Sequence, residues 1–139
     1  MRLPLLILAL ATLTACSTPL PSVDPQQAWI DLATPAPGGR LLMAERLDNQ
    51  RLGDGRFFQV TPGSHELMVR FDFEVFAAGM GMTTDPQERL CYLSLRYDHF
   101  QAGQRYRLEA RNLGFTPSAR LYNAQREIVA EERMINCVP

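Results

Sequence analysis

Two methionines separated by a single residue, Met80 and Met82, carry the most distinctive chemistry in this sequence. They lie in a segment of 11 residues, 77–87, that contains two glycines and connects two well-patterned strand segments. Most hairpin loops are about half that length or shorter. Thioether sulfurs are soft ligands that suit Cu(I), and a nearby histidine would complete a copper site. The segment equally suits a loop that contacts a partner or a membrane surface, or a plain long connection, so all three interpretations stay open.

The two histidines, His65 and His99, are the other candidates for metal binding or proton transfer. His65 could act as a ligand or a general base, or it could donate to a backbone carbonyl after a tight turn, since no carboxylate or cysteine stands beside it at ligand spacing. His99 follows Asp98, but adjacent strand residues point to opposite faces and form no dyad without a bulge. The sequence contains no nucleophile elbow, phosphate loop or His/Cys cluster. It therefore predicts no catalytic residue, no metal site, no cofactor and no enzymatic activity.

All 14 basic residues are arginines, whose planar guanidinium groups suit phosphate and carboxylate ligands. Four of them would share the outward face of two strands and form a comb facing lipopolysaccharide phosphates or peptidoglycan carboxylates: Arg96, Arg105, Arg107 and Arg111. The alternative is a solvated strand face in a protein from a GC-rich genome, with Asp98 and Glu109 neutralising part of the comb. The formal net charge of −1 argues against nucleic acid as a partner.

The N-terminus has the features of an export signal. Arg2 supplies a positive charge, residues 3–13 are apolar, and small residues precede a cysteine in Leu13-Thr14-Ala15-Cys16. This tetrapeptide resembles the bacterial lipobox. The resemblance implies cleavage before Cys16, acylation of its thiol and attachment to a lipid bilayer without a spanning helix. Because Ser17 rather than aspartate follows the cysteine, the resemblance also implies the periplasmic face of the outer membrane. A plain signal cut near Ala15, with Cys16 as a free thiol, is the alternative.

Two cysteines remain once Cys16 is assigned to lipid. Export places Cys91 and Cys137 in an oxidising compartment, so we expect them to form a disulfide. The alternative is one buried thiol and one exposed thiol.

The chain divides into an expected signal peptide (1–15), a lipidated cysteine with a proline-rich tether (16–27) and one domain (28–139). If fully extended, the tether would reach about 36–40 Å and let the domain stand off the bilayer. With 46% apolar and 21% charged residues, the domain has the composition of an ordinary globular protein with one core.

The domain has the pattern of an all-β protein, in which short alternating apolar runs are separated by Gly, Pro, Asn and Asp. Strands are predicted at 28–32, 40–47, 57–60, 64–76, 88–98, 104–111, 120–123 and 127–131. A helix over 124–135 is an open alternative to the last of these. Spacing of this kind predicts a single antiparallel β-sandwich of about seven strands.

Two hairpins follow from the turn residues. Thr61-Pro62-Gly63-Ser64 suits a type II turn with positive φ at Gly63, which would pair Val60 with His65. A four-residue loop at 100–103, or a bulge near Asp98-His99, would join the strands here and place Asp98 opposite Arg105.

The run Val60-Thr61-Pro62-Gly63-Ser64-His65-Glu66-Leu67 resembles the start of a strand in PEGA-type and related small envelope β-domains, which have Pro-Gly followed by His. The resemblance implies a sandwich and no particular activity. Together with the lipobox, it indicates a membrane-anchored periplasmic lipoprotein that acts as a non-enzymatic binding or structural module of the cell envelope. Its partner would be another envelope protein or an envelope glycan, and a copper protein using Met80 and Met82 is the alternative.

Overall fold

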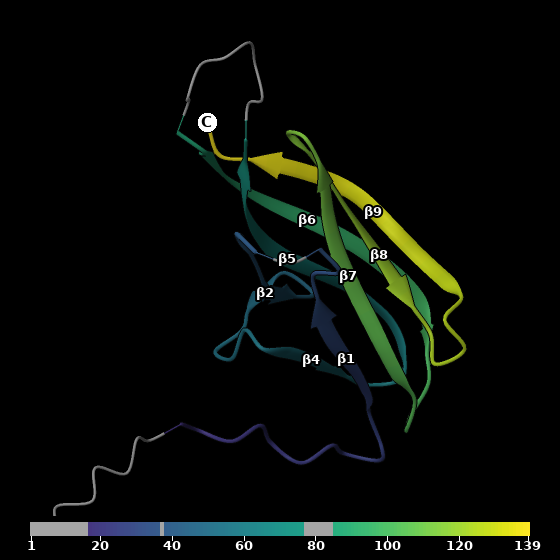
Figure 1. Ribbon diagram of the computed structural model, residues 1–139. Coiled ribbons are helices and arrows are strands. Elements are labelled where there is room, and N and C mark those ends of the chain that lie inside the picture. The colour runs from purple at the N-terminus through teal and green to yellow at the C-terminus, as the bar shows by residue number, and fades with distance from the viewer. Residues whose placement is uncertain (1–16, 37, 77–84) are drawn as a thin grey trace, which may run out of the picture.

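A computed structural model describes residues 17–36, 38–76 and 85–139 (Figure 1). The described residues form nine strands: β1 (Ala28–Ala33), β2 (Arg40–Leu47), β3 (Gln50–Arg51), β4 (Phe57–Val60), β5 (Gly63–Val75), β6 (Gln87–Phe100), β7 (Arg105–Leu113), β8 (Thr116–Tyr122) and β9 (Ile128–Cys137).

The protein is all-β, as predicted, but the arrangement of its strands differs from the expected antiparallel sandwich of seven. The nine strands form one mixed sheet in the order β3-β2-β5-β6-β9-β8-β7-β1-β4. The β1 and β7 strands run parallel, with Trp29 level with Arg105, and every other neighbouring pair is antiparallel. Residues 128–137 are a strand, so the helical alternative there is wrong. Among the described residues, no helix has the length and apolar character needed to cross a membrane.

Period-two alternation places the core on one face of the long strands. In β5, Leu67, Val69, Phe71, Phe73 and Val75 are buried, as predicted, while the residues between them are partly exposed. They join the inward side chains of the other strands in one cluster. The curvature of the sheet brings Tyr97 and Phe100 of β6 against Tyr106 of β7, with ring centroids 5.9 and 5.0 Å apart.

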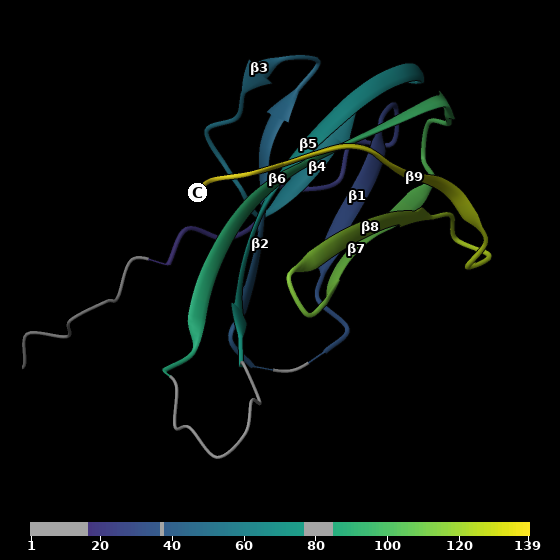
Figure 2. The ribbon, with the colours of Figure 1, turned by 90° about the horizontal axis from the view of Figure 1, so that it is seen from above.

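The β9 strand joins the two halves of the sheet. Its first residues pair with β8 and its later residues pair with β6, and Figure 2 shows the strand crossing from one side to the other. The predicted disulfide is present at the C-terminal end of this strand, where Cys91 and Cys137 are directly opposite each other and their sulfurs are 2.04 Å apart.

The hairpin expected at Thr61-Pro62-Gly63-Ser64 does not form. Gly63 has the predicted positive φ, at 111°, but the chain uses this bend to leave one edge of the sheet and enter its other half. Val60 pairs with Ala28 of β1, and His65 pairs with Tyr97 of β6.

The expected hairpin between β6 and β7 is also wrong. Two strands, β9 and β8, lie between them in the sheet. Asp98 therefore does not face Arg105. It accepts hydrogen bonds from the Ser64 hydroxyl (2.6 Å) and from Arg96 (3.0 Å) on its own side.

Residues 17–27 are not a free tether, because the domain holds them at several points. The Arg56 guanidinium donates to the Thr18 carbonyl (2.8 Å), and the Asp24 amide donates to the Gln59 side chain (3.0 Å). The Gly103 amide donates to the Gln27 carbonyl (2.9 Å). These contacts leave far less extended length than the sequence suggested.

Candidate functional site

Two of the predicted binding residues, Arg105 and Arg107, line the same hollow on the outer face of the sheet. Arg126 from the β8–β9 turn completes its basic lining, and the volume is about 290 Å³. We call it the arginine hollow. Its remaining lining residues are Asp31, Tyr106, Tyr122, Asn123 and Ala124.

Arg105 is held by Asp31, a partner that sequence reasoning missed. Its Nε and Nη2 atoms donate to the two carboxylate oxygens at 2.6 and 2.9 Å. Arg105 lowers the pKa of Asp31; burial opposes this, and the indole N–H of Trp29 reinforces it by donating at 3.0 Å. Trp29 is itself buried on the outer face, stacked on Phe57 with ring centroids 4.3 Å apart. Arg105 is therefore fixed in position beside the hollow.

Arg107 is shared between the hollow and a buried carboxylate. Its Nε donates to Glu109 at 2.8 Å, and Arg111 donates to the other oxygen of Glu109 at 3.3 Å. Glu109 was expected to be solvated, but the residue is only 6% exposed. The Nη atoms of Arg107 have no hydrogen-bond partner within the described part of the chain, so they can donate to a ligand.

Arg126 occupies an unusual backbone position. Its φ is +62°, in the left-handed region where glycine or asparagine is usual. The turn is held by the Asn123 side chain, which accepts the amides of Gln125 and Glu127 at 3.0 and 2.9 Å. The Arg126 side chain is exposed and has no ion pair among the described residues. With three arginines and one aspartate, the hollow carries a formal charge of +2.

The predicted comb is largely neutralised, because each of its four arginines has a carboxylate partner. Several outward arginines, here and elsewhere, find that partner two residues along the same strand or loop. This spacing gives the pairs Arg56–Asp54, Arg70–Asp72, Arg96–Asp98 and Arg107–Glu109. Arg96 and Arg111 do not line the arginine hollow, and Arg111 is bound to Glu109.

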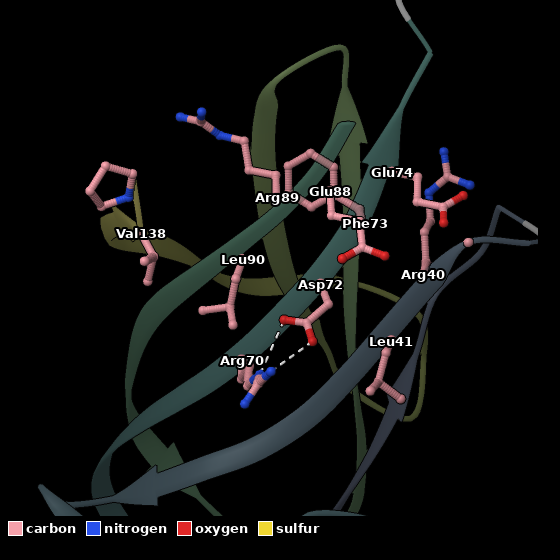
Figure 3. A pocket seen from close by; sticks show the side chains of 12 residues that line it. Arg40, Leu41, Arg70, Asp72, Phe73, Glu74, Glu88, Arg89, Leu90 and Val138 are labelled. Atoms are coloured by element: carbon pink, nitrogen blue, oxygen red, sulfur yellow. Dashed lines mark hydrogen bonds and ion pairs between the residues drawn. The ribbon is translucent and has the colours of Figure 1, made fainter. Parts of the chain in front are cut away.

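A larger hollow, about 600 Å³, lies on the outer face of β2, β5 and β6 and is also lined by Val138 and Pro139, which follow β9 (Figure 3). Its three arginines stand among three carboxylates, and Figure 3 shows Arg70 bonded to Asp72 along β5. Glu74 and Glu88 are directly opposite each other on neighbouring strands. This larger hollow has no excess of either charge and therefore no preference for anions.

His65 has a carboxylate partner that its sequence neighbours did not reveal. Its Nδ1 lies 2.6 Å from Asp48 and its Nε2 lies 2.7 Å from the Thr61 carbonyl. Asp48 and Asn49 form the two-residue turn between β2 and β3, with φ of 48° and 66°. Burial raises the pKa of Asp48, but hydrogen bonds from the Glu66 amide and from His65 outweigh it, so the net pKa is lowered. His65 thus ties this turn to the bend before β5, as the structural interpretation expected.

Three other predicted residues lie outside the described residues: Cys16, Met80 and Met82. The lipid and copper hypotheses therefore stay predictions. Within the described ranges, no group of three or more His, Cys, Asp or Glu side chains could hold a metal ion.

Sequence reasoning missed Asp31, Asp48 and Arg126. The pair Asp48-Asn49 was a usable signal, because these residue types favour the positive φ angles of a two-residue hairpin turn. Asp31 and Arg126 gave no comparable signal, since a parallel pairing and a turn geometry bring them to the hollow. No known family model, curated protein or solved structure matches this chain.

Proposed function

We propose that this protein is a non-enzymatic lipoprotein of the bacterial cell envelope, anchored through acylated Cys16 to the periplasmic face of the outer membrane. Its β domain acts as a binding module for anionic groups of an envelope component. Phosphate and carboxylate both fit the donors of the arginine hollow.

The arginine hollow carries this proposal, because there positive charge exceeds the local supply of carboxylates. Asp31 and Trp29 fix Arg105, Glu109 fixes Arg107, and Arg126 is presented by a turn. Guanidinium donors held in advance lose little conformational freedom when a ligand binds. The distinct sequence of the signal segment supports the anchoring part of the proposal.

Anchoring is tested by replacing Cys16→Ser. We expect loss of acyl label and loss of the protein from the membrane fraction, because the serine hydroxyl cannot form the thioether. Detergent-phase partitioning that persists in the variant would refute acylation at this position.

Anion binding is tested on the acylated protein in detergent, with inorganic pyrophosphate as the phosphate probe and citrate as the carboxylate probe. We expect Arg107→Gln to weaken binding about tenfold, since one charge-assisted hydrogen bond contributes about 1.5 kcal/mol. Arg133→Gln is the matched control, because Arg133 is exposed on β9 and lines a different hollow. Equal affinities of the two variants would contradict the proposal.

A further inference from the structure

We propose that the anion taken by the arginine hollow is the phosphate of phospholipid headgroups in the membrane that anchors the chain, so that this end of the domain lies on the bilayer. The inference rests on the proposed function and deepens it by naming the partner.

The hollow and the point where residues 17–27 enter the domain belong to one end of the molecule. The Gln27 carbonyl accepts the Gly103 amide (2.9 Å), and the Trp29 amide donates to the Gln104 carbonyl (3.1 Å). Arg105 follows directly and is level with Trp29. Figure 1 shows residues 17–27 leaving where β1 and β7 begin, away from the β7–β8 tip and the C-terminus.

The segment before β1 is short and partly bound, which limits how far the domain can move from the anchor. The Arg56–Thr18 hydrogen bond holds the segment two residues after Cys16. Two extended residues span at most about 7 Å. An acyl group on Cys16 therefore places the Thr18 carbonyl, and with it the Arg56 guanidinium, within the depth of the headgroup region.

The side chains at this end suit a lipid surface. Leu20 and Val23 are 53% and 47% exposed on the bound segment, although each is apolar. The hollow adds a formal charge of +2, and each arginine near an anionic membrane surface favours binding. Apolar side chains that enter the interface beside arginines that reach phosphates are the usual composition of a membrane-contacting surface.

The test measures which end of the acylated protein touches the bilayer. The protein is reconstituted into vesicles of phosphatidylethanolamine and phosphatidylglycerol that contain a lipid with a nitroxide on its headgroup. A fluorophore is attached either through Ala124→Cys, in the turn that lines the hollow, or through Leu113→Cys, at the opposite end, where the native side chain is 88% exposed.

We expect strong quenching at position 124 and little at position 113. Arg107→Gln should lower the ratio of docked to undocked protein about fivefold, as should high salt, while Arg133→Gln leaves it unchanged. Equal quenching at both positions, or quenching at position 124 that Arg107→Gln does not change, overturns the inference.

Failure of the inference is distinguishable from failure of the proposed function. If Arg107→Gln weakens pyrophosphate binding but position 124 is not quenched, the arginine hollow binds an anion from another source, and only the membrane assignment falls. Retention of the protein on purified peptidoglycan sacculi, abolished by Arg107→Gln, would identify peptidoglycan carboxylates as that source. If the protein carries no acyl group, both proposals fail.

Discussion

Of the two hollows on the outer face, the larger has no net charge and the smaller has a positive net charge. The larger hollow, about 600 Å³, has three arginines and three carboxylates, whereas the arginine hollow, about 290 Å³, has three arginines and one carboxylate. On volume alone, the larger hollow would be chosen as the binding site. Excess positive charge selects the arginine hollow, because its Arg126 has no carboxylate partner among the described residues and its Arg107 shares Glu109 with Arg111.

The largest expected effect is a loss of stability near the larger hollow that leaves binding at the arginine hollow unchanged. Cys137→Ser removes a disulfide between residues 46 apart in sequence, and the chain-entropy model gives a loss of about 4 kcal/mol in the free energy of unfolding. Cys137 precedes Val138, which lines the larger hollow. Hydrogen exchange should speed up first along β9 and the start of β6, while pyrophosphate affinity at the arginine hollow stays the same. A fall in that affinity at temperatures where the variant is folded would show that the two hollows are coupled.

The second prediction makes the charge difference greater. Glu109→Gln keeps the shape of the side chain but removes the carboxylate that Arg107 and Arg111 share. We expect a loss of about 1–3 kcal/mol in the free energy of unfolding and tighter pyrophosphate binding. The control is Glu131→Gln, whose carboxylate pairs with Arg120 at 3.4 Å with both side chains exposed, and which should change little. Denaturant titration and calorimetry measure both quantities.

At Arg126, one substitution should raise stability and weaken anion binding at the same time. Arg126→Gly removes left-handed strain of roughly 1–2 kcal/mol, and after the greater unfolded-state freedom of glycine a gain of about 0.5–1 kcal/mol remains. Arg126→Gln loses the charge but keeps the strain. Both variants should bind pyrophosphate more weakly, but only the glycine variant should melt at a higher temperature. If affinity is unchanged in both, Arg126 does not belong to the site.

The smallest expected effect depends on pH. Because Arg105 lowers the pKa of Asp31 below its usual 3.8, the pair adds stability above about pH 5, and this stability is lost as the pH falls through the lowered pKa. Exposure of both side chains keeps the contribution under about 1 kcal/mol. Asp31→Asn should therefore be slightly less stable than the native protein at pH 7 and equally stable near pH 2. The same change removes the one negative charge that lines the hollow, and this gain in charge should outweigh the looser hold on Arg105, so pyrophosphate binding at pH 7 should be stronger.

The sequence was sufficient to predict most of the strands and their buried faces, because period-two alternation is a local property. The bounds of β2 and β4 were predicted correctly, and so were the buried side chains of β5. Turn residues were a poorer guide to partners. Pro62-Gly63 correctly required a positive φ at Gly63, but a bend of this kind suits a crossing between two halves of a sheet as well as a hairpin.

Pairing between distant strands could not be predicted, and the candidate site depends on it. The parallel register of β1 and β7 places Asp31 beside Arg107 and close enough to bind Arg105, 74 residues later in the chain. Local alternation suggested Asp98 as the partner instead. The arginine side of the site was thus predictable from residue type and strand face, whereas its acidic side required the tertiary fold.

The position of β9 has a consequence for how the chain reaches its native state. Residues 128–137 are the only described segment that hydrogen-bonds to both β6 and β8. When the chain emerges from its N-terminus onward, the strand that closes the gap between these two halves arrives after all the other described strands. Until then, β6 and β8 each have an unpaired edge. We therefore expect a partly emerged chain to stay unfolded or to depend on a chaperone that covers those edges.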